Sequence, residues 1–441
     1  MRKEKLLPFM FFLSLVPGDE WYFEHIWTPA RLFSWFNYRL PIKVNAFELA
    51  CLFLLLGSSK KSKSTLARPV VVAIRFSLAS VAFCILNGLA RGGLTKPIYT
   101  QVHMLVLGMV FALTCATVLS TAEDFRRLEN AIVYAAIWQA VTVFLVYLAF
   151  RGQELPQTLT THEDSVTFVV GLLTLISQAI ELRTKTAMRR LIYLAPIILV
   201  AIQLNNRRLA WASLMGGLLV IYFLLPAKGK VTRKLNRALL VLLPVIVIYV
   251  GAGWGRKEPI FKPVASISSM FSAKATGELD RSTKARDNEN RSLVTMIPYN
   301  PLLGTGLGQR WVDLDPTYAV PESIFPMYYY SPHNSLLALL AFCGGLGCAG
   351  LWMVFPVSVY LNARTYRRST NRVERTVAVI GIIEVVAYLN QCYGDMGVAF
   401  MTPATIMGAG VAAAARLSVY GARSISSQDR MQRESVKSTA A

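Results

Sequence analysis

The sequence has few charged residues: they make up 16% of its 441 positions, whereas an ordinary soluble domain contains about 25%. Hydrophobic residues make up 54%, and the mean hydropathy is +0.44. This composition excludes a disordered chain and argues against a water-soluble globule. Length alone would suggest two or three soluble domains, but the apolar residues fall in blocks separated by short basic loops. The sequence therefore predicts an all-α, polytopic membrane protein.

Acidic residues are especially scarce, with 25 Asp and Glu against 46 Lys and Arg, a net charge of +21. Such an excess often signals nucleic-acid binding. However, no motif that reads DNA or RNA is present, and membrane proteins concentrate Lys and Arg in their cytoplasmic loops. We therefore expect membrane lipid, and no nucleic acid, as a partner.

Only six cysteines are present, and none has the spacing of a zinc site. All lie in or beside apolar stretches, which favours buried thiols over disulfides. No Gly-Lys-Ser/Thr sequence follows a glycine-rich loop, so a nucleotide-binding P-loop is absent. We expect no cofactor and no metal. The cysteines are Cys51, Cys84, Cys115, Cys343, Cys348 and Cys392.

Long apolar stretches predict about twelve transmembrane helices, since a span needs about 20 apolar residues. Nine stretches are clear and three, of 12 to 14 residues, are weaker. Residues 6–17 could instead be a signal peptide, but no small-x-small cleavage site follows, which favours a retained span. The clear stretches are 69–90, 99–121, 131–150, 166–182, 209–226, 238–254, 333–361, 377–394 and 399–417, and the weaker ones are 6–17, 44–57 and 191–204.

Basic residues set the expected orientation. The connections at one end of the predicted bundle, together with both termini, carry 28 Lys and Arg, whereas the short connections at the other end carry eight. The positive-inside bias places the first set in the cytoplasm. We therefore expect a multi-pass protein of the bacterial inner membrane with both termini cytoplasmic. The expected parts are helices in 1–254, a large periplasmic loop in 255–332, helices in 333–417 and a tail in 418–441.

The 78-residue loop 255–332 breaks the pattern of short connections, and a loop of that size is usually functional. Its second half contains the run Asn300–Gly308, with Gly304, Gly306 and Gly308. Glycines allow tight turns and close backbone approach to a ligand. A plain turn explains them equally well.

The loop ends at His333, directly before an apolar stretch that begins with Asn334 and Ser335. One interpretation is an interfacial histidine followed by a helix cap. The other is a base at the mouth of a membrane cavity, because histidine titrates near ~6.5. Both fit the local sequence.

Several arginines fall at the expected periplasmic end, against the positive-inside bias. Arg207 and Arg208 occupy a connection of about four residues, and Arg91 ends another span. Arg286 and Arg291 lie in the long loop. Contact with lipid headgroups is one explanation. A site for a diphosphate is the other, because guanidinium groups grip phosphate oxygens in pairs.

These elements together resemble the O-antigen ligase and O-antigen polymerase superfamily of bacterial inner-membrane glycosyltransferases. The matching elements are the turn Asn206–Trp211, the arginine Arg286 fifteen residues before Pro301, the glycine run, and the sequence His333-Asn334-Ser335 leading into a span. The twelve-span architecture with one large late loop is a further match. Asn290 departs from the pattern, since the family often has an aromatic residue there.

The resemblance implies an enzyme that transfers a glycan from an undecaprenyl diphosphate-linked donor, without ATP or metal. The acceptor would be a second glycan, in a polymerase, or a lipid A–core sugar, in a ligase. A polysaccharide polymerase is slightly favoured, because the Asn-Arg-Arg turn looks less like typical ligases. By resemblance His333 would be the catalytic base or the residue that positions the acceptor. Arg208 and Arg286 would contact the diphosphate, with Arg207, Arg91 and Asn334 supporting; Arg207 could replace Arg208.

Other readings and residues stay open. A transporter or flippase of lipid-linked sugars could also use twelve spans and internal arginines, although no paired repeats are visible. Glu384 and Asp395 are candidates because ionisable groups within spans are functional by default. His162, in a predicted outward loop, could contact acceptor sugar or lie in solvent. We expect His333, Arg208 and Arg286 to line one cavity with Arg91 near.

Overall fold

The computed structural model describes most of the chain. The described residues are 3–16, 32, 33, 36, 44–58, 65–151, 159–205, 207–226, 229–256, 258–261, 264, 278–318, 321–323 and 325–419. The predicted tail 418–441 therefore lies almost entirely outside them.

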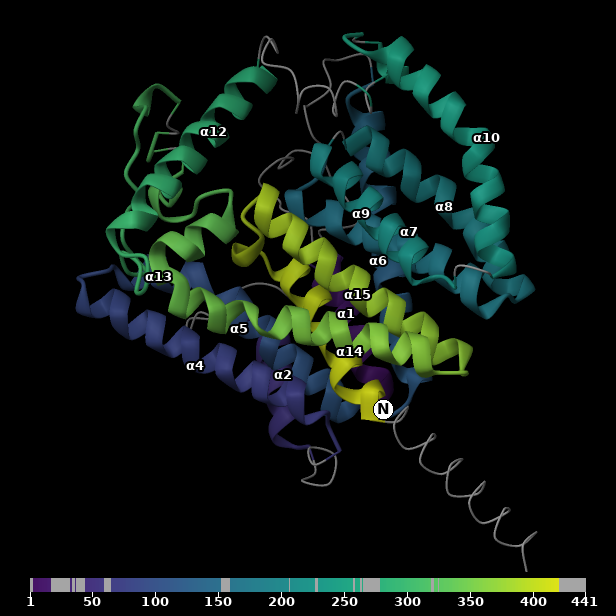
Figure 1. Ribbon diagram of the computed structural model, residues 1–441, viewed down its shortest axis with the longest axis horizontal. Coiled ribbons are helices and arrows are strands. Elements are labelled where there is room, and N and C mark those ends of the chain that lie inside the picture. Colours follow the sequence, from purple (N-terminus) through teal and green to yellow (C-terminus); the bar gives the residue numbers. More distant parts are fainter. Residues whose placement is uncertain are drawn as a thin grey trace, which may run out of the picture.

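The described residues fold into helices and contain no strand, so the all-α prediction is confirmed (Figure 1). Each of the twelve predicted spans coincides with helix, and among the described residues eight helical stretches are long and apolar enough to cross a membrane. The helices are α1 (Lys3–Leu15), α2 (Ala46–Leu56), α4 (Arg68–Ala90), α5 (Thr95–Val118), α6 (Ala122–Ala149), α7 (His162–Leu182), α8 (Lys185–Asn205), α9 (Arg208–Leu224), α10 (Lys230–Gly253), α12 (Glu278–Met296), α13 (Ser335–Trp352), α14 (Val354–Arg368), α15 (Arg372–Gly394) and residues 401–419.

Several helices begin earlier than the hydropathy predicts. Helix α8 starts at Lys185, six residues before the predicted 191, where the Thr184 hydroxyl accepts from the backbone N–H of Ala187 at 3.1 Å. Helix α7 starts at His162, where Thr161 and Asp164 form a capping box. Polar first turns continue a helix beyond the apolar core, whereas hydropathy detects only the part that suits lipid. His162 therefore opens a helix and does not lie in a loop.

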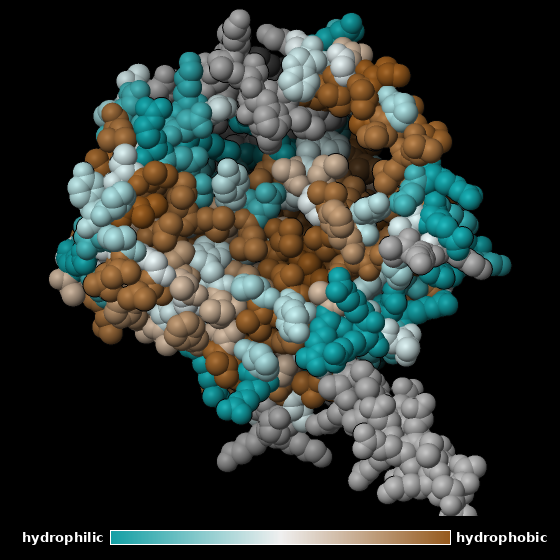
Figure 2. All heavy atoms as spheres, viewed as in Figure 1, coloured by the Kyte–Doolittle hydropathy of each residue, from teal (hydrophilic) through white to brown (hydrophobic). Residues whose placement is uncertain are grey.

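Helix α7 forms the centre of the bundle. In its most apolar 18-residue stretch, 89% of the residues are buried, and the helix packs against α6, α8, α9 and α15. Helix α10 is the opposite case, because none of the residues in its most apolar stretch is buried. Figure 1 shows α10 at one side of the molecule and α12 at the other. In the same view, Figure 2 shows a hollow between the largely hydrophobic surface of α10 and the largely polar surface of α12.

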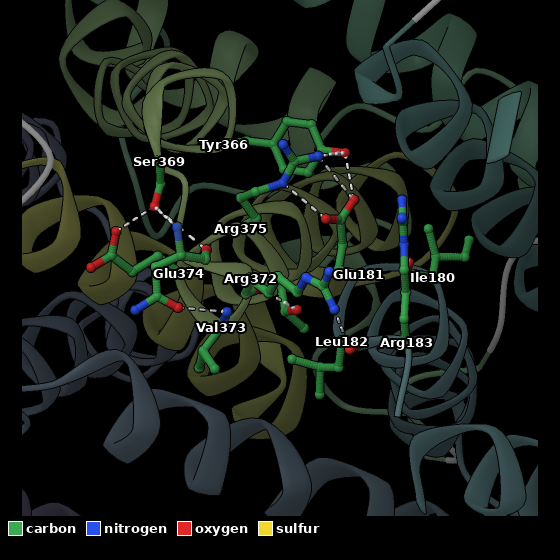
Figure 3. Close-up of polar contacts among 12 residues, drawn as sticks. Ile180, Glu181, Leu182, Arg183, Tyr366, Ser369, Arg372, Val373, Glu374 and Arg375 are labelled. Atoms are coloured by element: carbon green, nitrogen blue, oxygen red, sulfur yellow. Dashed lines mark hydrogen bonds and ion pairs between the residues drawn. The ribbon is translucent and has the colours of Figure 1, made fainter. Parts of the chain in front are cut away.

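A polar cluster joins three helices at the end of the bundle where α7 ends and α15 begins (Figure 3). Glu181 of α7 accepts from Tyr366 Oη of α14 at 2.7 Å and from Arg375 Nε of α15 at 2.9 Å. The Arg375 guanidinium also lies 4.4 Å from the centre of the Tyr366 ring. Because Glu181 is buried, this network fixes how the three helices meet.

The glycine run docks at the opposite end, against a break in α13. Gly304 has φ +71°, and a Cβ there would clash with the backbone of Phe342. The Gly306 amide donates to the Phe342 carbonyl at 2.9 Å, beside Gly344, where α13 leaves helical geometry with φ +64°. The glycines are thus explained by close approach of backbone to backbone.

The same run also packs on the end of α4. Gly88 and Gly93 leave room for the backbone of Leu307, and Gly308 donates to Gln101 Oε1 of α5 at 2.8 Å. The run therefore ties α4, α5 and α13 together at the end of the bundle where α9 begins and α15 ends.

Candidate active site

A cavity of about 300 Å³ opens at this end of the bundle, between α9, α12, the start of α13 and the end of α15. Its wall combines two arginines, a histidine, several amides and an aromatic ring. The lining residues are Arg208, Leu209, Ala212, Thr283, Arg286, Asp287, Glu289, Asn290, His333, Asn334, Asn390, Tyr393 and Gly394.

His333 is held in this wall by a buried carboxylate. Its Nδ1 lies 3.0 Å from Glu289 Oε2, and its backbone N–H donates to Glu289 Oε1. Glu289 is only 2% exposed, whereas the His333 side chain keeps 26% exposure. An ionised Glu289 accepts from Nδ1–H, which fixes the tautomer and leaves Nε2 as the proton-accepting nitrogen.

Asn334 begins α13 as its N-cap. Its Oδ1 accepts from the backbone N–H of Leu337 at 3.1 Å, and the residue is 3% exposed. This satisfies one of the backbone donors that a helix start leaves unpaired. Asn334 thus caps α13 directly after His333, and it also lines the cavity.

Arg208 and Arg286 reach the cavity from different helices. Arg208 is the first residue of α9, and its Nη1 donates to Thr283 Oγ1 of α12 at 3.3 Å. Arg286 lies on α12 one turn before Glu289, so both side chains fall on the same face of that helix. Two guanidinium groups and the histidine–carboxylate pair therefore line one cavity.

Arg207 points away from the cavity wall into a neighbouring cluster. Its Nη1 lies 3.1 and 3.2 Å from the two ring nitrogens of His162, and its Nη2 donates to the Thr160 carbonyl at 3.3 Å. His162 also pairs with Asp395, which follows α15, and its ring stacks on Phe400.

Asp395 connects this cluster electrostatically to the cavity. Burial by itself would raise the pKa of Asp395, but the hydrogen bond and charge of His162, together with Arg286 and His333, lower it to about 2. Asp395 is therefore ionised across the physiological range, next to the arginine and histidine of the cavity.

Arg91 lies elsewhere. It ends α4 and lines a second cavity of about 720 Å³ at the other end of α12, with Tyr299 and Arg310. The structure thus brings Arg208, Arg286, His333 and Asn334 together, and places Arg207 and Arg91 beside them in separate environments.

The sequence analysis did not predict Glu289 as a site residue, and it did not predict that Asn390 and Tyr393 line the cavity. Glu289 could have been found from its position three residues after Arg286 in a polar helix, which puts both on one face. Within the described ranges, no group of three or more His, Cys, Asp or Glu residues could hold a metal ion.

The fold and the cavity define a class: a polytopic helical membrane protein with a cationic cavity built around a histidine–carboxylate pair. Residues 193–352 match the family model described as O-antigen ligase. The match confirms the predicted relationship to the O-antigen ligase and polymerase superfamily, over the segment that holds Arg208, Arg286, Glu289 and His333. No curated protein matches the chain in a sequence search.

Proposed function

We propose that this protein transfers a glycan from undecaprenyl diphosphate to a sugar hydroxyl at the periplasmic face of the bacterial inner membrane. The observation that carries the proposal is the shared cavity of His333, Arg208 and Arg286, with His333 held by Glu289. The family match over this segment supports the same class of reaction.

Arg208 and Arg286 bind the diphosphate. A guanidinium donates paired hydrogen bonds to phosphate oxygens and stays charged at any physiological pH. Negative charge accumulates on the diphosphate as it leaves, so fixed cations around it stabilise the transition state. Asp287 and Glu289 line the same cavity, and the charge of Arg286 acts on Asp395, so carboxylates balance part of this positive charge.

His333 activates the acceptor. The acceptor hydroxyl oxygen attacks the anomeric carbon of the donor, the bond from that carbon to the diphosphate oxygen breaks, and the hydroxyl proton moves to His333 Nε2. Glu289 stabilises the imidazolium that forms and keeps Nε2 directed at the cavity. General base catalysis of this kind contributes roughly 10²–10⁴ in rate.

Polar groups in the wall bind the sugars. The Asn290 Oδ1 accepts no hydrogen bond from the described residues and is buried, although the side chain lines the cavity. A buried amide oxygen without a donor is costly, and a sugar hydroxyl would satisfy it. Asn390 and Tyr393 line the wall contributed by α15.

The decisive experiment is a transfer assay in nanodiscs with an undecaprenyl diphosphate-linked oligosaccharide, with and without a lipid A–core acceptor. Longer lipid-linked chains without added acceptor identify a polymerase, which we favour, and transfer only to lipid A–core identifies a ligase. We expect His333→Ala and Arg208→Ala to lower either rate at least about 100-fold.

The matched control is Arg291→Ala, which removes an exposed arginine of α12 that lines neither cavity. Activity that survives both cavity substitutions contradicts the site. Movement of intact donor across vesicles, without transfer to any acceptor, would identify a transporter instead.

A further inference from the structure

We propose that the second cavity, between the end of α4 and the end of α12, binds an acidic sugar of the glycan being extended or attached. The proposal rests on the proposed function for the identity of the ligand as a glycan. The cavity measures about 720 Å³, and its nine lining residues are Arg91, Thr295, Met296, Tyr299, Thr305, Gln309, Arg310, Val312 and Leu314.

The charge of the cavity calls for an anion. Two of the lining residues are arginines and none is acidic. Arg91 contacts neutral groups: its Nε donates to Asn87 Oδ1 at 3.1 Å and its Nη2 to Asn300 Oδ1 at 3.5 Å. Among the described residues no carboxylate pairs with it. An exposed guanidinium fixed by amides is prepared to bind a carboxylate or a phosphate.

Arg310 is positioned differently. It pairs with Glu322, both about half exposed, and its guanidinium lies 4.4 Å from the centre of the Tyr329 ring. An exposed ion pair is worth little, so an anionic ligand can compete with Glu322. The stacked ring keeps the guanidinium at the wall.

The remaining lining residues suit a sugar. Tyr299 is 81% exposed at the rim, where its ring is free to stack on the apolar face of a sugar. Gln309 is fixed by donating from Nε2 to the Arg91 carbonyl at 2.7 Å. Thr305 adds a hydroxyl, and Met296, Val312 and Leu314 add apolar surface. A sugar ring presents the matching combination of apolar faces and peripheral hydroxyls.

The two cavities share α12, which suits one extended glycan. Arg286 lines the first and Thr295 the second, nine residues further along the helix. At 1.5 Å per residue this is about 14 Å. A short oligosaccharide can therefore present a hydroxyl to His333 while an acidic unit further along it contacts Arg91.

The acidic group has two sources, a carboxylate on a repeat-unit sugar or a phosphate on a core sugar, and the test separates them. Binding to protein in nanodiscs is measured by calorimetry with an oligogalacturonate, a phosphorylated oligosaccharide and a neutral maltooligosaccharide. We expect one or both acidic probes to bind more tightly than the neutral one. Whichever acidic probe binds better identifies the source.

Variants assign the binding to this cavity. Arg91→Gln, which removes the charge and keeps an amide, should weaken the acidic probe about tenfold or more. Tyr299→Ala should weaken it several-fold, and Glu322→Gln, which releases Arg310, should tighten it. Arg291→Ala, the exposed control on α12, should leave it unchanged.

The outcome is independent of the transfer reaction. His333→Ala should abolish transfer and keep probe binding if both proposals hold. Equal binding of neutral and acidic probes, or acidic binding unaffected by Arg91→Gln, overturns this proposal even where transfer is intact. Probe binding that depends on Arg91, without transfer from any donor, supports the second cavity and contradicts the proposed function.

Discussion

At the scale of single residues, the His333–Glu289 pair accounts for the most chemistry. A histidine at a helix start could be an ordinary interfacial residue. Here its Nδ1 faces a carboxylate that is almost fully buried, and the same carboxylate also accepts from the backbone N–H of His333. A buried carboxylate committed to one imidazole orients it and favours its protonated form during a reaction.

Glu289→Gln tests this role. The amide keeps the size of the side chain but loses the charge that stabilises an imidazolium. We expect kcat for glycan transfer to fall about 10- to 100-fold with little change in KM. Kinetics of the purified variant in nanodiscs measure both, and Glu258→Gln, at an exposed position, is the control. A KM effect alone would mean that Glu289 only shapes the cavity.

Asp395 gives a prediction of pH dependence. Its pKa falls from an ordinary value of 3.8 to about 2 in the folded protein, so its ionised form stabilises the fold. That stabilisation, on the order of 2 kcal/mol, is fully present above about pH 4 and is lost as the pH falls toward 2. Asp395→Asn should lower the unfolding temperature at pH 5–8.

The difference from wild type should shrink as the pH falls below about 4, because Asp395 is then protonated in the unfolded state and, as the pH approaches 2, in the folded state as well. Thermal unfolding in detergent across pH 3–8 measures it, with Glu258→Gln, at an exposed position outside both cavities, as control. A difference that grows toward acid pH would refute the assigned direction.

The residue roles could be predicted from the sequence only in part. Arg208, Arg286 and His333 were recognisable because each sits in a motif with family-like spacing. The sequence did not predict that Glu289 holds His333, nor that Arg207 contacts His162. Both contacts depend on how α7, α9, α12 and α13 pack, and the spacing of residues along one chain does not specify that packing. Arg207 and Arg208 are adjacent in sequence, but α9 begins between them, so Arg207 contacts His162 whereas Arg208 lines the cavity.

At the scale of elements, the run Asn300–Gly308 works as a connector. Its glycines adopt positive φ and contact the backbones of α13 and α4, and no ligand is needed to explain them. The run therefore supports both cavities indirectly. It packs on the break in α13, whose first residues lie beside the first cavity, and it contacts Arg91 in the second.

Gly304→Ala should disrupt this connection. Positive φ costs an alanine about 1–2 kcal/mol, and the added Cβ meets the Phe342 backbone, which cannot move aside. We expect a loss of at least ~2 kcal/mol in stability, measured as thermal unfolding or as the yield of folded protein. Gly251→Ala, within α10 at a position where a Cβ would meet no other atom within 4 Å, should be neutral or stabilising. Equal effects of the two substitutions would contradict this explanation.

Glu181→Ala should loosen the opposite end of the bundle. It removes the partner of both Tyr366 and Arg375 and leaves polar groups unpaired at a helix junction (Figure 3). We expect a destabilisation of roughly 2–3 kcal/mol. The exposed pair Glu123–Arg126 provides the comparison, since Glu123→Ala should cost no more than ~0.5 kcal/mol. A similar unfolding temperature for both variants would show that the cluster is dispensable.

The elements themselves were well predicted, because hydropathy reports directly on the lipid-facing and buried segments. The helix starts were not. Polar first turns, as in α7 and α8, carry no hydropathy signal, and the kink at Gly344 follows from contact with a distant segment. Helix α12 is largely polar, so hydropathy carries no signal for it.

At the scale of the whole molecule, antiparallel helices bring the ends of α4, α15 and α12 and the starts of α9 and α13 to one end of the bundle. Both cavities open there, and the cluster around Glu181 lies at the other end. This arrangement suits a lipid-linked donor that enters from the membrane and a sugar acceptor that approaches from the aqueous side.

The most direct test of the central claim is the release of undecaprenyl diphosphate from a radiolabelled lipid-linked donor in nanodiscs. The account predicts one undecaprenyl diphosphate for each glycosidic bond formed. It predicts release at least about 100-fold slower in His333→Ala and in Arg208→Ala, and unchanged in Arg291→Ala. Release at the wild-type rate in His333→Ala, or glycosidic bonds formed without release, would contradict it.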